Sequence, residues 1–119
     1  MMSIYSMPRG EQTSEDEYNR VVQAARDEFE RALQVAREKF QNVQQAAEKN
    51  YTNAREEIRI KYVKPGEPIP AAYEKAALAV QDELYKVVQA AQQEYDKAYQ
   101  AAWDKYIKAV QAARDEFDK

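Results

Sequence analysis

Large apolar residues recur along most of the chain at intervals of eleven, and polar residues fill most of the positions between them. Ten such positions follow one another, and nine of the ten hold an aromatic ring. They are Tyr18, Phe29, Phe40, Tyr51, Tyr62, Tyr73, Leu84, Tyr95, Tyr106 and Phe117. Because eleven residues fill three helical turns at about 3.67 residues per turn, the pattern predicts α-helices with one apolar face.

Small residues accompany the rings on this face. Alanine and valine fill most of the positions three and seven residues after each ring, as at Val21 and Ala25 or at Val43 and Ala47. Large and small side chains in alternation allow two facing helices to interdigitate. The sequence therefore predicts an all-α fold built from 11-residue (hendecad) repeats, which favour straight or slightly right-handed supercoils.

One repeat, YVKPGEPIPAA, breaks the helical pattern in the middle of the chain. Pro65, Pro68 and Pro70 lack backbone donors and cannot continue a helix, and Gly66 permits a turn conformation. We expect a domain over residues 14–119, with a helix over 14–63, a turn over 64–70 and a second helix over 71–118.

A reversal between Glu67 and Pro68 sets the two helices antiparallel and pairs residues whose numbers sum to about 135. The ten ring positions then meet level by level and form the core of a long two-helix hairpin. The expected pairs are Tyr62 with Tyr73, Tyr51 with Leu84, Phe40 with Tyr95, Phe29 with Tyr106, and Tyr18 with Phe117. An alternative, in which each helix packs on a separate partner, stays open.

Two helices alone bury one face each, and much of that face is alanine, so we expect self-association as a coiled coil, a four-helix-type bundle or a filament. A second set of apolar residues on the second helix lies beside the main face, where most other repeats are polar. These residues are Leu78, Tyr85, Tyr99, Trp103 and Ile107. They form an oligomer interface in one interpretation and a wider hairpin core in the other.

The first residues, 1–13, stand outside the repeat and are expected to form a flexible arm, because Pro8 and Gly10 interrupt any regular element. Ser14 and Glu17 have the spacing of a capping box at the start of the helix. Ile4, Tyr5 and Met7 are candidates for a docking arm that inserts into a neighbouring copy. A disordered arm is the alternative.

The amino-acid composition argues against most kinds of catalytic and metal-binding site. The chain has 119 residues, of which 45% are hydrophobic and 33% charged, with a net charge of -3 and neither Cys nor His. The commonest general base, metal ligands and nucleophile pairs are therefore missing. We expect no catalytic or metal site, no cofactor and no small-molecule substrate. Acidic residues interleave with the basic ones, so no nucleic-acid partner is expected either.

The pattern favours a non-enzymatic structural protein that acts as a scaffold, spacer or filament subunit. The alternative is an amphipathic protein that binds lipid or another surface. The 11-residue period of this sequence resembles that of exchangeable apolipoproteins, perilipins, synucleins and desiccation-protective proteins. The matched levels of rings and small residues favour protein contacts, which makes a membrane surface the less favoured partner. With no signal peptide or transmembrane segment in the sequence, a cytoplasmic location is expected.

Overall fold

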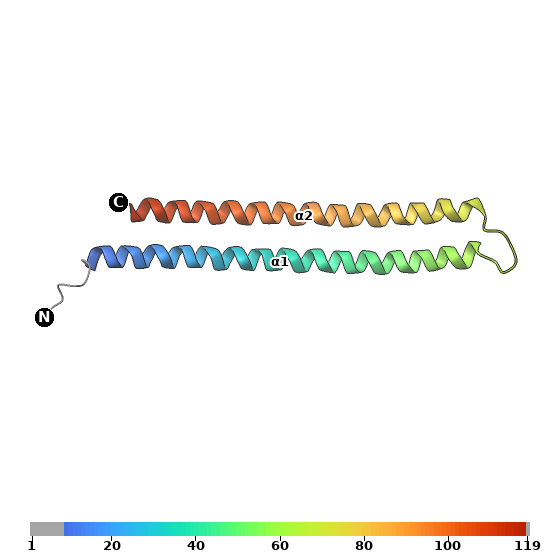
Figure 1. Ribbon diagram of the computed structural model, residues 1–119, viewed down its shortest axis with the longest axis horizontal. Coiled ribbons are helices and arrows are strands. Elements are labelled where there is room, and N and C mark those ends of the chain that lie inside the picture. Colours follow the sequence, from blue (N-terminus) through green and yellow to red (C-terminus); the bar gives the residue numbers. More distant parts are fainter. Residues whose placement is uncertain (1–8, 119) are drawn as a thin grey trace. The chain divides into compact units, whose positions relative to one another are not determined.

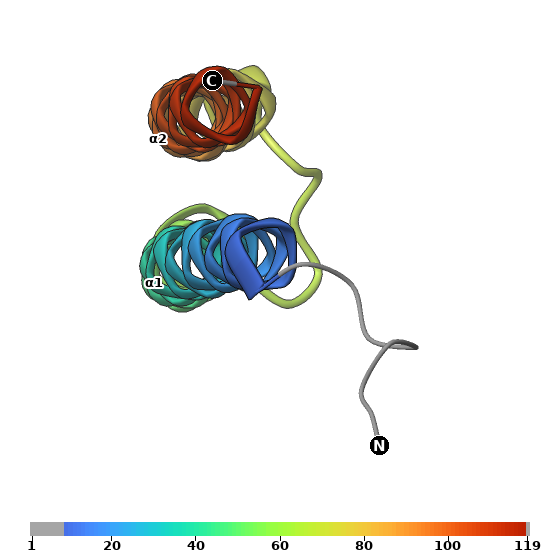
Figure 2. The same ribbon diagram turned by 90° about the vertical axis from the view of Figure 1, so that its left-hand side faces the viewer.

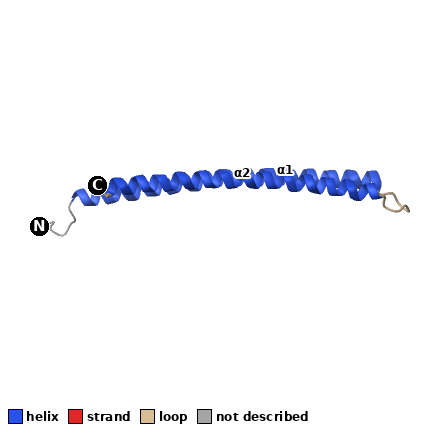
Figure 3. Cartoon of the chain, turned by 90° about the horizontal axis from the view of Figure 1, so that it is seen from above, coloured by secondary structure: helices blue, strands red, loops and turns tan. Residues whose placement is uncertain are grey.

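The protein, described here by a computed structural model of residues 9–118, consists of two long α-helices that pack against each other in a hairpin (Figure 1). Helix α1 spans Arg9–Tyr62 and helix α2 spans Ala71–Phe117. Side chains are described for residues 14–118. Helix accounts for nearly all of this chain, and the loop between α1 and α2 is the main exception (Figure 3). The predicted all-α hairpin is confirmed.

Helix α1 begins earlier than the sequence pattern indicates. It starts at Arg9, so residues 9–13, which the pattern assigned to the arm, belong to the helix, and Ser14 lies inside the helix instead of capping it. Arg9, Glu11 and Gln12 are good helix formers, which explains why the helix extends beyond the apolar repeat.

The loop at residues 63–70 follows from its prolines and its glycine. Pro65 has no backbone donor and disfavours helix at the residue before it, and α1 ends at Tyr62. Gly66 has a φ of 76°, in the left-handed region that residues with a Cβ rarely adopt. Pro70 directly precedes α2, and its carbonyl accepts a hydrogen bond from the Tyr73 amide at 3.0 Å. A proline here suits the start of a helix, whose first amides lack intrahelical acceptors.

The chain divides into two compact units. Unit 2, Ala36–Lys97, contains the loop and the helix segments on either side of it. Within this unit, the rings of Phe40 and Tyr95 lie 6.2 Å apart between their centroids. Tyr51 and Leu84 line one depression between the two helix segments. Residues distant in sequence thus form the apolar contacts of unit 2.

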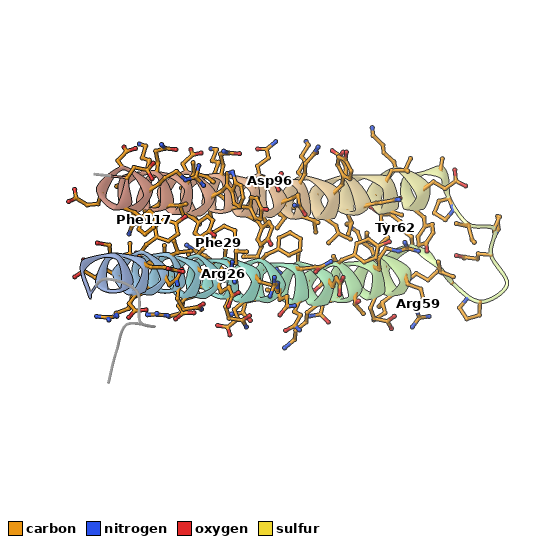
Figure 4. The ribbon with its side chains drawn as sticks, turned by 60° about the vertical axis from the view of Figure 1, so that its left-hand side comes forward. Arg26, Phe29, Arg59, Tyr62, Asp96 and Phe117 are labelled. Atoms are coloured by element: carbon orange, nitrogen blue, oxygen red, sulfur yellow. The ribbon has the colours of Figure 1, made fainter. Side chains whose placement is uncertain are left out.

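Unit 1 comprises Met1–Val35 and Ala98–Lys119. In its described part, the first segment of α1 and the last segment of α2 lie side by side (Figures 1 and 2). The ring centroids of Tyr18 and Phe117 are 5.4 Å apart, and those of Phe29 and Tyr106 are 5.7 Å apart. Phe29 and Phe117 lie between the two helices (Figure 4).

Polar side chains on the outer surfaces support each helix locally. In α1, Gln23 donates a hydrogen bond to Asp27 at 3.0 Å, and the same i to i+4 contact recurs in α2. Lys86 pairs with Asp82 at 3.1 Å. Exposed contacts of this kind stabilise a helix by about 0.2–0.5 kcal/mol each, so their effect is on helix formation more than on the contact between helices.

Burial in the hairpin is shallow. Among the residues whose side chains the structure describes, the buried ones are Ala36, Ala47 and Ala113, each 8% exposed. Nine of the ten predicted core residues are half-buried, and Phe117 is 43% exposed. Two helices cover only one side of each other's apolar face, which leaves the flanks of every ring open to solvent.

Candidate interaction surface

A cluster of four aromatic rings lies in unit 1. The Phe29 ring on α1 lies 5.8 Å from Tyr99, 5.7 Å from Trp103 and 5.7 Å from Tyr106, all between centroids. Trp103 also lies 5.7 Å from Tyr106. The three α2 residues are spaced by four and three, so one side of the helix presents all of them. Most of these contacts are edge-on or tilted, as aromatic pairs prefer.

These contacts leave much of the cluster exposed. Tyr99 and Trp103 are each 41% exposed, and Ile107, four residues after Trp103, is 42% exposed. Of the two interpretations that the sequence left open, the intramolecular contact therefore holds for Tyr99 and Trp103. Each still presents a large apolar surface to solvent, and their role as an oligomer interface stays a prediction.

The other two members of the predicted interface, Leu78 and Tyr85, belong to unit 2. Leu78 is 65% exposed and Tyr85 is 63% exposed. Seven residues separate them, which is about two helical turns, so they share one side of α2. Their large exposed fractions are those of surface residues and do not widen a core within unit 2.

A groove lies between the helix segments of unit 1, on the side of Tyr106 that faces away from Trp103 and Ile107. One part of it, with a volume of about 120 Å³, is lined mainly by apolar residues of both helices. A second part, of about 520 Å³, lies nearer the helix ends. Ala109 lines both parts. The apolar lining of the two parts comprises Tyr18, Val21, Ala25, Phe29, Ala32, Ala102, Tyr106, Ala109, Ala112, Ala113 and Phe117.

Charged residues border this groove. Glu28 and Lys105 line its smaller part and form an ion pair between α1 and α2. The hydrogen bond from Lys105, and then its charge, hold the pKa of the Glu28 carboxyl below its usual value. Glu17 and Glu116 line the larger part. The groove edge therefore carries more carboxylates than cations.

Unit 2 contains a polar cluster that the sequence pattern did not reveal. The Arg55 guanidinium lies 5.6 Å from the Tyr51 ring centroid and donates a hydrogen bond to its hydroxyl at 2.8 Å. Hydrogen bonding to Tyr73, and then to Tyr51, raises the pKa of Arg55. A signal was present, because Arg55 follows Tyr51 by four residues, the place that Leu33 takes after Phe29. A cation on the apolar face indicates a local polar partner.

The remaining predicted residues fall in two groups. Tyr62 and Tyr73 are half-buried beside the loop, and Lys61 lies over the Tyr62 ring at 5.3 Å from its centroid. Ile4, Tyr5 and Met7, the predicted docking arm, lie outside the described residues.

Residues 9–118 contain no group of three or more acidic side chains placed to hold a metal ion. In the same part of the chain, no helix has a stretch long and apolar enough to cross a membrane. Comparison with protein-family models, with curated proteins and with solved structures gives no match.

Proposed function

We propose that this chain is a non-enzymatic structural protein that associates with copies of itself to act as a scaffold, spacer or filament subunit. The observation that carries the proposal is the mismatch between apolar surface and burial. Three alanines are buried among the described side chains, whereas Trp103, Tyr85 and Leu78 are all at least 41% exposed. Burying one such large side chain contributes about 1.5–3 kcal/mol, so a second copy that covers several of them stabilises the assembly substantially.

The proposed organisation is a coiled coil of hendecad repeats. Three ring pairs support it, since Tyr18, Phe29 and Phe40 follow one another at intervals of eleven and each contacts a ring of α2. The buried alanines agree, because Ala36 and Ala47 are also eleven residues apart. A constant period keeps equivalent surfaces on one side of each helix, which suits a repeated contact with other copies.

Light scattering coupled to size-exclusion chromatography over a range of concentrations tests the proposal. We expect a mass that rises above the 13.8 kDa of one chain as concentration increases. Trp103→Glu is expected to reduce this mass while the helical circular dichroism persists, because a carboxylate replaces an exposed ring. Ala90→Glu, which adds the same charge at an exposed alanine of α2, is the matched control. A constant mass of one chain at every concentration overturns the proposed function.

A further inference from the structure

Unit 1 presents two different apolar surfaces on opposite sides of the ring of Tyr106. One is the aromatic ridge, defined as Tyr99, Trp103 and Ile107, each about two-fifths exposed. The other is the apolar groove described above, to which α2 contributes Ala102 and Ala109. At about 100° per residue, Trp103 and Ile107 lie on one side of Tyr106 around the helix, and Ala102 and Ala109 lie on the other.

The ridge and the groove therefore open on opposite faces of the helix pair. Trp103 precedes Tyr106 by three residues, and on α1 Arg26 precedes Phe29 by the same three residues. Since Phe29 and Tyr106 face each other in an antiparallel pair, Arg26 lies on the ridge face. Glu28 and Lys105, which line the groove, each directly precede one of these facing rings and share the other face. Neither surface can contact the other within one chain.

We propose that the groove of unit 1 receives the aromatic ridge of a second copy, so that copies join ridge to groove. This inference rests on the proposed self-association and specifies its geometry. The two surfaces complement each other in shape, because the ridge supplies large side chains and the groove is walled largely by alanine between rings. Large side chains packed against small ones produce the interdigitation that cores require.

One set of opposite charges also matches across this contact. The ridge face of unit 1 carries Arg26 and Arg114 together with the carboxylates Glu15, Glu30 and Asp118, and the groove is bordered by the carboxylates Glu17, Glu28 and Glu116 and by Lys105. Arg114 is thus a ridge-face cation that can meet the acidic end of the groove at Glu17 and Glu116. A cation opposite this acidic end directs one copy onto the next.

The spacing of these charges matches as well. Arg114 follows Trp103 by eleven residues, which is about 16.5 Å along a helix at 1.5 Å per residue. Glu116 follows Lys105 by the same interval. When Trp103 of one copy sits at the level of Lys105 in the next, Arg114 therefore reaches the level of Glu116 and Glu17. Both copies then have the same orientation.

A contact between two different surfaces has a definite consequence for assembly. Each new contact covers one ridge and one groove, so a row of any length keeps one free ridge at one end and one free groove at the other. Ridge-to-groove contacts between copies in the same orientation therefore continue indefinitely. The assembly is an open row of copies, whereas a contact of ridge with ridge closes as a dimer.

Mixing two complementary variants of the full chain tests the ridge-to-groove contact. The ridge variant is Ile107→Glu, which leaves the Phe29 ring contacts in place. The groove variant is Glu17→Arg with Ala112→Arg, both exposed residues that line the groove. We expect each variant alone to scatter as a single chain and an equimolar mixture to reach twice that mass. The mixture stops there because the intact ridge of one fills the intact groove of the other.

Circular dichroism verifies that each variant keeps its helices. If Ile107→Glu loses them, Trp103→Glu serves as the ridge variant instead. Gln93→Arg, at an exposed position outside both surfaces, is expected to assemble like the unaltered chain. A groove variant that still assembles alone, or a mixture that stays at the mass of one chain, overturns the ridge-to-groove contact. Either result leaves the proposed self-association standing, which fails only if the unaltered chain remains single at every concentration.

Discussion

The rings of Tyr18 and Phe117 lie with their centroids 5.4 Å apart and their planes tilted by 47°, although the two residues stand near opposite ends of the chain. Further into unit 1, Phe29 meets Tyr106 at 5.7 Å. The residue numbers of both pairs sum to the same value, as they must when two helices run antiparallel without a register shift. Ring contacts thus set the register of the helix pair in unit 1, since a shift by one residue would rotate these rings out of contact.

Among the described residues of unit 1, Phe29 is the ring with the most aromatic partners, and its removal provides a direct test of this register. We expect Phe29→Ala to lower the free energy of unfolding by about 2 kcal/mol, because it removes a half-buried ring together with three ring contacts. Urea unfolding followed by circular dichroism at one fixed concentration measures the loss. Val35→Ala, at a side chain that is 65% exposed, should change it by less than about 0.5 kcal/mol. Equal effects from the two substitutions would contradict a stabilising ring cluster.

The loop offers a test of backbone conformation alone. A Cβ added at Gly66 meets no atom within 4 Å, but the φ of 76° is unfavourable for any residue that has one. We therefore expect Gly66→Ala to cost about 1 kcal/mol of stability. Gly66→Asn should cost less, because asparagine tolerates the left-handed region. Thermal unfolding of the unaltered chain, Gly66→Asn and Gly66→Ala should show stability falling in that order. An alanine variant as stable as the asparagine variant would argue against this explanation.

The sequence was informative about which residues share a face and which levels meet. Pairs such as Phe40 with Tyr95 follow from the interval of eleven and from a reversal at the prolines, because both fix the geometry of the backbone. The contacts of Phe29 with Tyr99 and Trp103 did not follow as readily. Helical spacing gives the direction of a side chain but not how far a long ring reaches across to the neighbouring helix.

Three other features depend on properties that a repeat pattern does not encode. The start of α1 at Arg9 reflects the helix propensity of residues that lie outside the apolar repeat of the sequence. Arg55 lies on the apolar face, where it donates a hydrogen bond to Tyr51 and where Tyr73 helps to raise its pKa. Such a partnership is visible only when three side chains are placed together. The depth of burial was also beyond the pattern, because solvent access depends on what covers the flanks of each ring.

The Arg55 cluster permits a double-mutant cycle. We expect Tyr73→Phe to lower the unfolding midpoint, because it removes a hydroxyl that hydrogen-bonds to the guanidinium. In an Arg55→Met background the same change should have a smaller effect, since methionine has no donor for that hydroxyl. The difference between the two shifts in midpoint measures the coupling. Identical shifts in both backgrounds would show that the Tyr73 hydroxyl acts independently of Arg55.

The ion pair between Glu28 and Lys105 predicts a pH dependence with a definite sign. Lys105 lowers the pKa of Glu28 in the folded state, so the pair stabilises the fold above the unfolded pKa of about 4.3. This contribution disappears as the pH falls through the lower, folded pKa. An NMR titration of the Glu28 side-chain carbons should show that Lys105→Gln raises this pKa toward its usual value, whereas Lys108→Gln leaves it in place. The stabilities of the unaltered chain and Lys105→Gln should converge at acid pH, since a protonated Glu28 no longer pairs with Lys105; a gap that persists there would assign the effect of Lys105 to packing of its aliphatic chain.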